Sequence, residues 1–560
     1  MKKILILILT TIWICFSLII VFTKSYVKPS YIVRSYLWNE VSDLWRMRTN
    51  SGFFTYLTLA DLNNDDNCEI LTSFSRLNNE IFSPILVLDE NTGTPMLNIT
   101  ARYAVASSIA VGDINDDNKP EIVAAISNYT SFNGSVWVLN TNGTIIWEQK
   151  VYAPWQLSLA DIDCDRKLEV ILGSLNYTYA FDDNGTLLWK IRIPLGCIVA
   201  PVVGNFDYDD ALEIVLGSLN DNIYVIDDDG TLLWKFRTRD KITLSPALGD
   251  VDNDKRLEII VASSNDVYAL NDDSSLLWRI NVDSKVTAGP ILGDFDNDGK
   301  LEIVLGTFYG TIYVLNGEDG SLLWKEKIFL KGEFKSENLK NNSDSSFSFL
   351  TTLLNRSFPD IVISFITSDL DDDGILDIVV ASLNGNVSIF RGIDGKMLWT
   401  FELKDDAFTH GISPLGSNDV DNDGFLELII CADHEIYVFD GFYGRFAQWN
   451  QFRGNEMHSI EICDFDLDGL EDKIEKEIGS SIADCDSDND KLLDGWEYIH
   501  GLSPINSDSD NDGWQDGIEV FYESNPLNPF EYPSYPIMAW IFVLLMFSSF
   551  IIIVIIIHKR

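Results

Sequence analysis

Short apolar runs alternate with acidic turns along most of the chain. A typical unit begins at Gly293 with GDFDNDGKLEIVLG, an acidic loop that leads directly into a β-branched run, and it continues with TIYVLN. Other units then place a turn such as DDNG or DDDG and close on LLW. Short β-rich runs between Gly, Asn and Asp turns are typical of strands, so each unit predicts one four-stranded sheet.

The unit occurs eight times, with 44 to 52 residues between most consecutive copies and 75 between the sixth and the seventh. One such sheet cannot bury both of its faces, whereas sheets stacked around an axis bury both and protect their edges. We therefore predict an all-β fold, a β-propeller of seven or eight blades, and the eight acidic loops favour eight. Tryptophans that close the units are expected to pack between blades: Trp147, Trp189, Trp234, Trp278, Trp324, Trp399 and Trp449.

The acidic loops carry the candidate chemistry, because carboxylates this close together repel one another unless a cation lies between them. Side-chain oxygens at loop positions 1, 3, 5 and 9, with Gly at position 6, match the first part of an EF-hand calcium loop. Hard oxygen ligands in this number suit Ca²⁺ better than Mg²⁺ or zinc. A solvated acidic turn is the alternative, and repetition in register favours calcium. The predicted ligands are Asp61, Asn63, Asp65, Glu69, Asp113, Asn115, Asp117, Glu121, Asp161, Asp163, Asp165, Glu169, Asn205, Asp207, Asp209, Glu213, Asp250, Asp252, Asp254, Glu258, Asp294, Asp296, Asp298, Glu302, Asp369, Asp371, Asp373, Asp377, Asp419, Asp421, Asp423 and Glu427.

Position 6 distinguishes the loops, because it often needs a left-handed backbone that Gly adopts without steric cost. Gly299, Gly374 and Gly424 hold this position in the last three loops, which we expect to bind calcium best. Arg166 and Lys255 hold it in the third and fifth loops, which we expect to bind weakly.

After the propeller region the acidic repeat shortens to 22 residues. The segments DFDLDGLEDKIE, DSDNDKLLDGWE and DSDNDGWQDGIE place carboxylates at positions 1, 3, 5, 9 and 12, and position 12 is where a complete EF-hand loop carries its bidentate Glu. A disordered acidic linker is the alternative to three further calcium loops. The predicted ligands of this stalk are Asp464, Asp466, Asp468, Asp472, Glu475, Asp486, Asp488, Asp490, Asp494, Glu497, Asp508, Asp510, Asp512, Asp516 and Glu519.

Both repeats resemble known families. The acidic loop followed by an EIV strand resembles the FG-GAP repeats of integrin α-type propellers and their bacterial and archaeal relatives. The half-unit YVLN-x-x-x-G-x-LLW resembles the PQQ-like propeller repeat, and WNQFRGNEMH at 449–458 resembles a phrase found beside such propellers. The 22-residue repeat resembles thrombospondin type 3 repeats. The resemblance covers roughly residues 38 to 458 of the propeller and implies calcium and fold, but no particular activity.

The charge and the two ends of the chain bear on partners and location. Asp and Glu outnumber Lys and Arg by 86 to 40, which argues against nucleic acid because phosphate binding needs a basic surface. The apolar run 4–22 reads as a signal peptide or signal anchor, and 537–557 is long enough to span a bilayer. The basic tail after 537–557 predicts a cytoplasmic C-terminus. We therefore expect a cell-membrane protein with most of its chain extracytoplasmic. Nine N-x-S/T sequons agree with this location: Asn98, Asn128, Asn133, Asn142, Asn176, Asn184, Asn341, Asn355 and Asn386.

Seven cysteines add little to this picture. Cys463 and Cys485 hold equivalent stalk positions, but their pairing cannot be read from sequence. Buried apolar positions are expected for Cys68, Cys164, Cys197 and Cys431.

The expected organisation has six parts. They are a signal segment at 1–24, the propeller at 25–458 with an insertion at about 331–357, the stalk at 459–523, a proline-rich spacer at 524–536, a transmembrane helix at 537–557 and a cytoplasmic basic tail at 558–560.

These features favour a non-catalytic calcium-binding surface protein that presents its propeller for adhesion or for recognition of a protein or glycan. One alternative is a propeller enzyme, either a calcium-dependent polysaccharide lyase or a quinoprotein dehydrogenase. The sequence has no C-x-x-C-H or H-E-x-x-H motif and no vicinal cysteine pair, and His410 and His434 are the only histidines within the propeller repeats. The other alternative is an envelope assembly scaffold, the role of some cofactor-free PQQ-like propellers.

Overall fold

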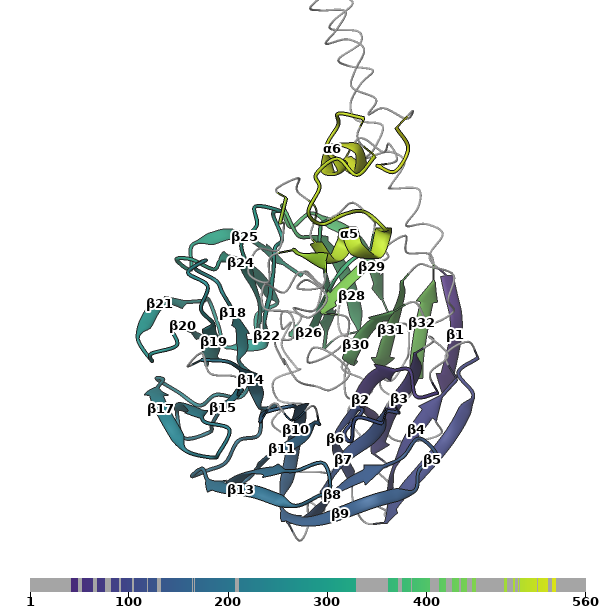
Figure 1. Ribbon diagram of the computed structural model, residues 1–560, viewed down its shortest axis with the longest axis vertical. Coiled ribbons are helices and arrows are strands. Elements are labelled where there is room, and N and C mark those ends of the chain that lie inside the picture. Colours follow the sequence, from purple (N-terminus) through teal and green to yellow (C-terminus); the bar gives the residue numbers. More distant parts are fainter. Residues whose placement is uncertain are drawn as a thin grey trace, which may run out of the picture.

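Eight small antiparallel sheets form a ring around a central axis (Figure 1). This arrangement confirms the predicted all-β propeller and the count of eight blades. The computed structural model describes residues 42–529 except 49–52, 64–67, 76–81, 90–91, 103–104, 118, 128–131, 164, 166, 207–210, 329–360, 371–374, 384, 403–411, 419–425, 433–434, 441–445, 450–477, 481–486, 489–491, 493, 511 and 522–525. No helix among the described residues is long and apolar enough to cross a membrane. The runs 4–22 and 537–557, the insertion and the first stalk loop lie outside them.

Each blade runs from an inner strand near the axis to an outer strand at the rim (Figure 1). Blade 1 consists of β2 (Phe53–Ala60), β3 (Glu69–Ser75), β4 (Phe82–Leu88) and β5 (Pro95–Arg102). Blade 2 consists of β6 (Val105–Gly112), β7 (Glu121–Ser127), β8 (Asn133–Leu139) and β9 (Ile145–Tyr152). Blade 3 consists of β10 (Pro154–Ala160), β11 (Glu169–Ser174), β12 (Tyr177–Phe181) and β13 (Leu187–Arg192). Blade 4 consists of β14 (Val202–Gly204), β15 (Glu213–Gly217), β16 (Asn222–Ile226) and β17 (Leu232–Arg237). Blade 5 consists of β18 (Ala247–Gly249), β19 (Glu258–Ser263), β20 (Asp266–Leu270) and β21 (Leu276–Asn281). Blade 6 consists of β22 (Val286–Gly293), β23 (Glu302–Thr307), β24 (Thr311–Asn316) and β25 (Leu322–Lys327). Blade 7 is β26 (Val362–Asp369), β27 (Asp377–Ser382), β28 (Asn386–Arg391) and β29 (Met397–Glu402), and blade 8 combines β30 (Ile412–Asn418), β31 (Glu427–Ala432) and β32 (Glu435–Asp440) with β1 (Ser42–Arg48).

The ring closes through blade 8, whose strands come from both ends of the propeller. β1 pairs antiparallel with β32, with Trp45 opposite Val438 and Arg46 opposite Tyr437. This register matches that of the other outer strands, in which Trp189 lies opposite Ala180 and Lys190 opposite Tyr179. Hydrogen bonds between strands that are distant in sequence therefore hold the first and last blades together.

The prediction that Trp449 closes the eighth unit is wrong. β33 (Phe446–Trp449) pairs instead with the inner strand of blade 7, where Trp449 lies opposite Thr367. The segment adds a fifth strand to that sheet, because β1 already occupies the outer edge of blade 8.

One buried apolar cluster fills each of the eight interfaces between neighbouring blades. In β23, Ile303 and Leu305 pack towards blade 5, whereas Val304 packs towards blade 7. The second strand of a blade thus has apolar neighbours on both faces, which explains its unbroken apolar sequence. Outer strands such as β17 alternate between exposed and partly buried positions.

The tryptophans of the outer strands bridge neighbouring blades, as predicted. The indole Nε1 of Trp189 donates to the carbonyl of Asp228 in the next blade at 2.6 Å, and Trp278 donates to Gly317 at the same distance. Trp147 and Trp324 make equivalent bonds to the next blade. Each bond satisfies the polar end of a large apolar side chain at the interface.

Two stalk helices, α5 (Asp494–His500) and α6 (Asp516–Phe521), lie beyond the propeller in sequence. Leu492 and Leu502 belong to the same buried apolar cluster as the core of blades 6 and 7, and Val520 packs against it. Figure 1 places α5 beside this part of the ring. Apolar contacts therefore join the described part of the stalk to the propeller.

Substitutions at two glycines compare two contributions to stability. One is the cost of a left-handed backbone, and the other is the cost of displacing a tryptophan. Gly230 has a φ of 87°, and a Cβ there would lie 2.8 Å from Cγ of Trp189. Gly299 has a φ of 79°, and a Cβ there would meet no atom within 4 Å. Gly230→Ala should lower the free energy of unfolding by about 1 to 3 kcal/mol more than Gly299→Ala, because only the first change overpacks an interface.

Chemical denaturation in the presence of a chelator measures both variants without a metal contribution. Equal losses would contradict the proposed role of Trp189 in holding neighbouring blades together.

Candidate metal centres

Each acidic loop joins the inner strand of a blade to its second strand. In blade 6 the loop runs between Gly293 and Glu302, which are paired across β22 and β23. The position-9 carboxylate is therefore the first residue of the second strand, at the edge of the interior. All eight position-9 residues begin their strands and are at most 4% exposed: Glu69, Glu121, Glu169, Glu213, Glu258, Glu302, Asp377 and Glu427.

The buried carboxylate makes the same backbone contact in every described loop. In blade 6 the N–H of Phe295, at loop position 2, donates to Glu302 Oε2 at 2.9 Å. Val251 donates to Glu258 at 3.0 Å, and Leu62, Ile114, Ile162, Phe206 and Leu370 make equivalent bonds. A carboxylate in this position ties the start of the loop to the start of the next strand.

Burial makes these carboxylates hard to ionise without a compensating positive charge. It raises the pKa of Glu302 and of Glu258 to about 9, and repulsion from Asp294 and Asp252 respectively adds to the effect. Burial likewise raises the pKa of Glu169 to about 8. A bound cation would reverse this tendency, because it favours the charged form of every carboxylate around it.

Backbone groups orient the position-1 carboxylate. Asp294 accepts the N–H groups of Asn297 at 2.7 Å and Gly299 at 2.8 Å, and Asp250 accepts that of Lys255 at 2.7 Å. Position 6 adopts the left-handed conformation expected from the sequence, with φ of 79° at Gly299 and 69° at Lys255. Lys255 adopts this backbone at a cost of about 1 to 2 kcal/mol, since its Cβ crowds the following carbonyl.

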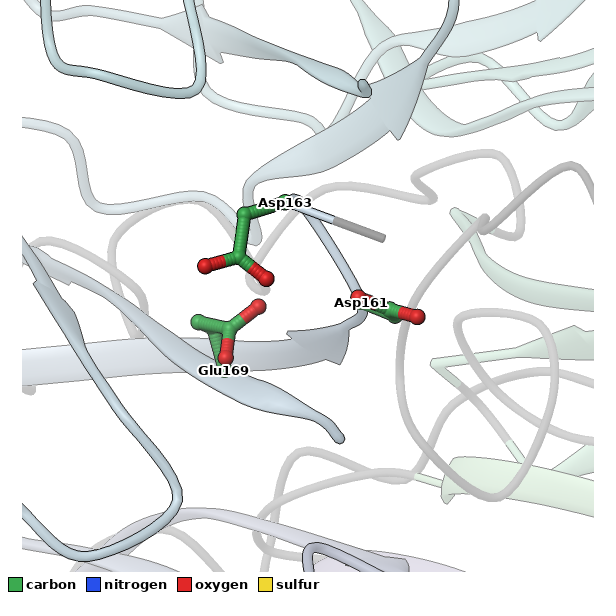
Figure 2. A group of neighbouring side chains, drawn as sticks. All are labelled: Asp161, Asp163 and Glu169. Carbon is green, nitrogen blue, oxygen red and sulfur yellow. The ribbon is translucent and has the colours of Figure 1, made fainter. Parts of the chain in front are cut away.

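The carboxylates of three propeller loops converge. Ligand atoms from Asp161, Asp163 and Glu169 all lie within 4.8 Å of one another, and Figure 2 shows the carboxylates of Asp163 and Glu169 turned towards each other. The other two groups are Asp250, Asp252 and Asp254, and Asp294, Asp296 and Glu302. Oδ1 of Asp252 is buried and has no hydrogen-bond partner among the described residues. An all-oxygen donor set with an unpaired buried oxygen fits a hard cation such as Ca²⁺.

The first two loops differ because Asn stands at position 3. The side-chain amide of Asn63 donates to Glu69, and that of Asn115 donates to Glu121 at 3.1 Å. Here an amide hydrogen supplies the positive partner of the buried carboxylate. In the fourth loop only Asn205 and Glu213 are described, in the seventh only Asp369 and Asp377, and in the eighth only Glu427. Asp65, Asp207, Asp209, Asp371, Asp373, Asp419, Asp421 and Asp423 lie outside the described residues.

The described stalk loops repeat the geometry of the propeller loops. The N–H of Ser509, at position 2, donates to the position-9 carboxylate of Asp516 at 2.9 Å, and Ser487 donates to Asp494 at 2.7 Å. Asp508, Asp510 and Asp512 form a group within 4.8 Å, and Oδ2 of Asp510 and of Asp512 are buried without a hydrogen-bond partner among the described residues.

The ends of these stalk loops are also buried. The position-9 and position-12 residues Asp494, Glu497, Asp516 and Glu519 are 0% exposed. Asp464, Asp466, Asp468, Asp472, Glu475, Asp486 and Asp490 lie outside the described residues. The second and third stalk loops therefore share the features that make the propeller loops fit a cation.

The sequence patterns do not predict an ion pair made by a basic side chain at loop position 7, but three loops have one. Lys167 Nζ lies 3.2 Å from Asp183 Oδ2, Arg256 Nη1 lies 3.1 Å from Asp272 Oδ2, and Lys300 Nζ lies 2.7 Å from Glu318 Oε1. In each case the acidic partner belongs to the turn between the third and fourth strands of the same blade. The signal in the sequence is a basic residue at position 7 in units whose turn carries an acid.

Comparisons with known proteins agree with this repeat architecture. Residues 133–346 match the family model described as outer membrane protein assembly factor BamB, and residues 105–139 match the FG-GAP repeat model. These matches support a propeller built from PQQ-like and FG-GAP units. No curated protein sequence matches the chain significantly.

Solved structures share the fold at low sequence identity. Sqt1 of Chaetomium thermophilum, bound to the N-terminus of ribosomal protein L10, is 12% identical, with a TM-score of 0.51 over 72% of this chain and 100% of that chain. Sqt1 of Saccharomyces cerevisiae is 14% identical, with a TM-score of 0.50 over 71% and 98%. BamB of Moraxella catarrhalis is 14% identical, with a TM-score of 0.43 over 71% and 97%. The similarity to the two Sqt1 structures, at these identities, shows the fold alone.

The raised pKa of Glu302 predicts how stability depends on pH without calcium. Its pKa of about 9 in the folded protein exceeds its ordinary value of 4.5, so between these values the native state holds a proton that the unfolded chain has released. The free energy of unfolding should therefore fall as pH rises from about 4.5 to about 9. Glu302→Gln should reduce the slope, and chemical denaturation in chelator at several pH values measures it.

Glu326→Gln, which changes an exposed carboxylate on the outer strand of the same blade, is the matched control. A slope that is identical in wild type and Glu302→Gln would contradict the assignment.

Proposed function

We propose that this chain is a non-catalytic calcium-binding protein of the cell surface whose propeller recognises a protein or glycan partner. The observation that carries the calcium part is the convergence of loop aspartates on a buried position-9 glutamate. Asp294 and Asp296 approach Glu302 in this way, and all three side chains are acidic. Three carboxyl groups this close together, one of them buried, need a nearby positive charge if all three are to be ionised at once.

Calcium suits these loops for reasons of ligand type and place. Carboxylates at positions 1, 3, 5 and 9 would hold the ion, which accepts six to eight oxygens in flexible geometry. Its role would be structural, since it would fix the end of the inner strand against the start of the second strand. Outside a cell, free calcium is abundant enough to fill weak sites of this kind.

Exposed aromatic side chains support partner recognition. Phe132, Tyr152 and Tyr309 are 47%, 41% and 46% exposed. They lie at the strand ends opposite the acidic loops, since Phe132 precedes β8, Tyr152 ends β9 and Tyr309 lies between β23 and β24. Aromatic residues are enriched where proteins bind partners. The ions and the recognition surface would therefore occupy opposite faces of the ring.

The cell-surface part rests on the sequence. The apolar run 537–557 would anchor the chain, and the stalk with its proline-rich spacer would hold the propeller away from the bilayer. The apolar contact of Leu492 and Leu502 with blades 6 and 7 supports a stalk that is joined to the propeller at a defined place.

An envelope assembly scaffold is the second candidate. It is favoured by the match of residues 133–346 to the family model of an outer membrane protein assembly factor. Crosslinking on intact cells distinguishes the two candidates, because a scaffold would yield membrane-protein partners of the same cell whereas a recognition protein would yield external ligands.

Removing calcium should lower the thermal midpoint of residues 30–530. One site at a free-ion concentration of about 100 times its Kd contributes about 2.7 kcal/mol to folding. Thermal melts with and without a chelator measure the effect, and an unchanged midpoint would contradict calcium binding. In equilibrium dialysis Asp296→Ala should bind one ion fewer, whereas Asp319→Ala, in an exposed turn of the same blade, should match the wild type.

A further inference from the structure

We propose that neighbouring acidic loops bind calcium as a coupled row, so that occupancy of one loop raises the affinity of the loops beside it. The inference rests on the proposed calcium binding and concerns how the sites act on one another. Three sets of contacts connect a loop with the blade that precedes it.

The first connection is a direct backbone bond between loops of adjacent blades. The N–H of Leu168, at position 8 of the third loop, donates to the carbonyl of Ile114, at position 2 of the second loop, at 3.2 Å. The N–H of Ile114 in turn donates to Glu121 of its own loop. Leu212 and Ile162 repeat the same bond between the fourth and third loops at 3.2 Å. Position 8 immediately precedes the position-9 ligand, so the placement of one ligand depends on the loop next to it.

The second connection is a turn that is wedged between two loops. Gly317 lies in the turn of blade 6, where a Cβ would be 2.3 Å from the carbonyl oxygen of Leu301 and 2.8 Å from Cβ of Val251. Leu301 is position 8 of the sixth loop and Val251 is position 2 of the fifth. Trp278 of blade 5 fixes this turn through its bond to the Gly317 carbonyl.

Blade 7 repeats this wedge. A Cβ on Gly392 would lie 2.3 Å from the carbonyl oxygen of Leu376 and 3.0 Å from Cδ1 of Phe295, and Trp324 of blade 6 donates to the Gly392 carbonyl. The same positions, 8 and 2, are thus brought together by different contacts at four interfaces of the ring, those between blades 2 and 3, 3 and 4, 5 and 6, and 6 and 7.

The third connection is the position-7 ion pair. Lys167 reaches Asp183, whose carbonyl accepts the indole N–H of Trp147 from blade 2 at 2.8 Å. Lys300 reaches Glu318, the neighbour of Gly317. Because Lys167 and Lys300 lie two residues before the position-9 ligand, they hold the loop against the turn that contacts the preceding blade. We assign both as positioning residues for the row.

The sign of the coupling follows from these contacts. A cation that orders one loop also fixes the position-2 carbonyl, which receives the neighbouring loop's N–H. The second cation then meets a partner loop that has already lost part of its conformational freedom, and it binds more tightly. Repulsion between ions in different loops acts in the opposite direction, and salt screens it over about 8 Å at physiological ionic strength.

Hydrogen exchange during a calcium titration of the full chain tests the row. In the wild type, amides of the second, third and fourth loops should gain protection over one narrow range of calcium concentration. Asp163→Ala, which removes a ligand from the third loop, should raise the calcium midpoint of the second and fourth loops at least threefold and leave the sixth unchanged. Asp296→Ala should do the reverse, shifting the fifth and seventh loops while the third keeps its wild-type midpoint.

Two lysine variants separate positioning from simple structural damage. Lys167→Met should broaden the titration between the second and third loops, Lys167→Arg should restore it, and Lys325→Met, on the exposed outer strand of blade 6, should change nothing. If neither aspartate variant shifts the calcium midpoint of the neighbouring loops, the proposed coupling is wrong, although the loops still bind calcium. Loops that gain no protection in the wild type would instead overturn the calcium proposal itself.

Discussion

The buried carboxylate at loop position 9 is the constraint on which the rest of the propeller depends. It begins the second strand of every blade, is at most 4% exposed, and in seven loops accepts the N–H of position 2. A carboxylate at this place carries a cost of desolvation that a single backbone bond offsets only in part. The surrounding aspartates raise that cost and, at the same time, supply the ligands that a cation would need to remove it. The packing of each blade and the proposed metal binding would therefore depend on the same side chain.

The repeat made most of the fold predictable from sequence. Strand order within a blade, the number of blades and the contact of the tryptophans with the next blade follow from a local pattern that recurs eight times. The closure was not predictable in this way, because β1 and β32 are separated by almost the whole propeller and nothing local marks them as partners. Its one visible signal is LW at Leu44 and Trp45, which matches the start of the other outer strands.

The candidate site was predictable to a similar degree. The left-handed backbone at position 6 follows from spacing, as Gly299 and Lys255 show, and the same spacing predicts the candidate ligands. The burial of Glu302 could not be read from spacing, because it depends on the tertiary structure around the start of β23. The ion pair of Lys300 with Glu318 and the contact of Leu492 with blades 6 and 7 also depend on tertiary structure. Sequence patterns predict the candidate ligands, whereas the contacts between their loops depend on the fold.

A diffraction experiment on crystals grown with calcium tests directly whether the buried position-9 carboxylates bind the ion. Anomalous peaks are expected in the third and sixth loops, each within about 2.3 to 2.6 Å of carboxylate oxygens that include Glu169 and Glu302 respectively. These glutamates should also keep their bonds to Ile162 and Phe295, so that one carboxylate serves both the ion and the backbone. Crystals grown with calcium in which both loops hold only water, with the glutamates still buried, would contradict calcium binding by these carboxylates.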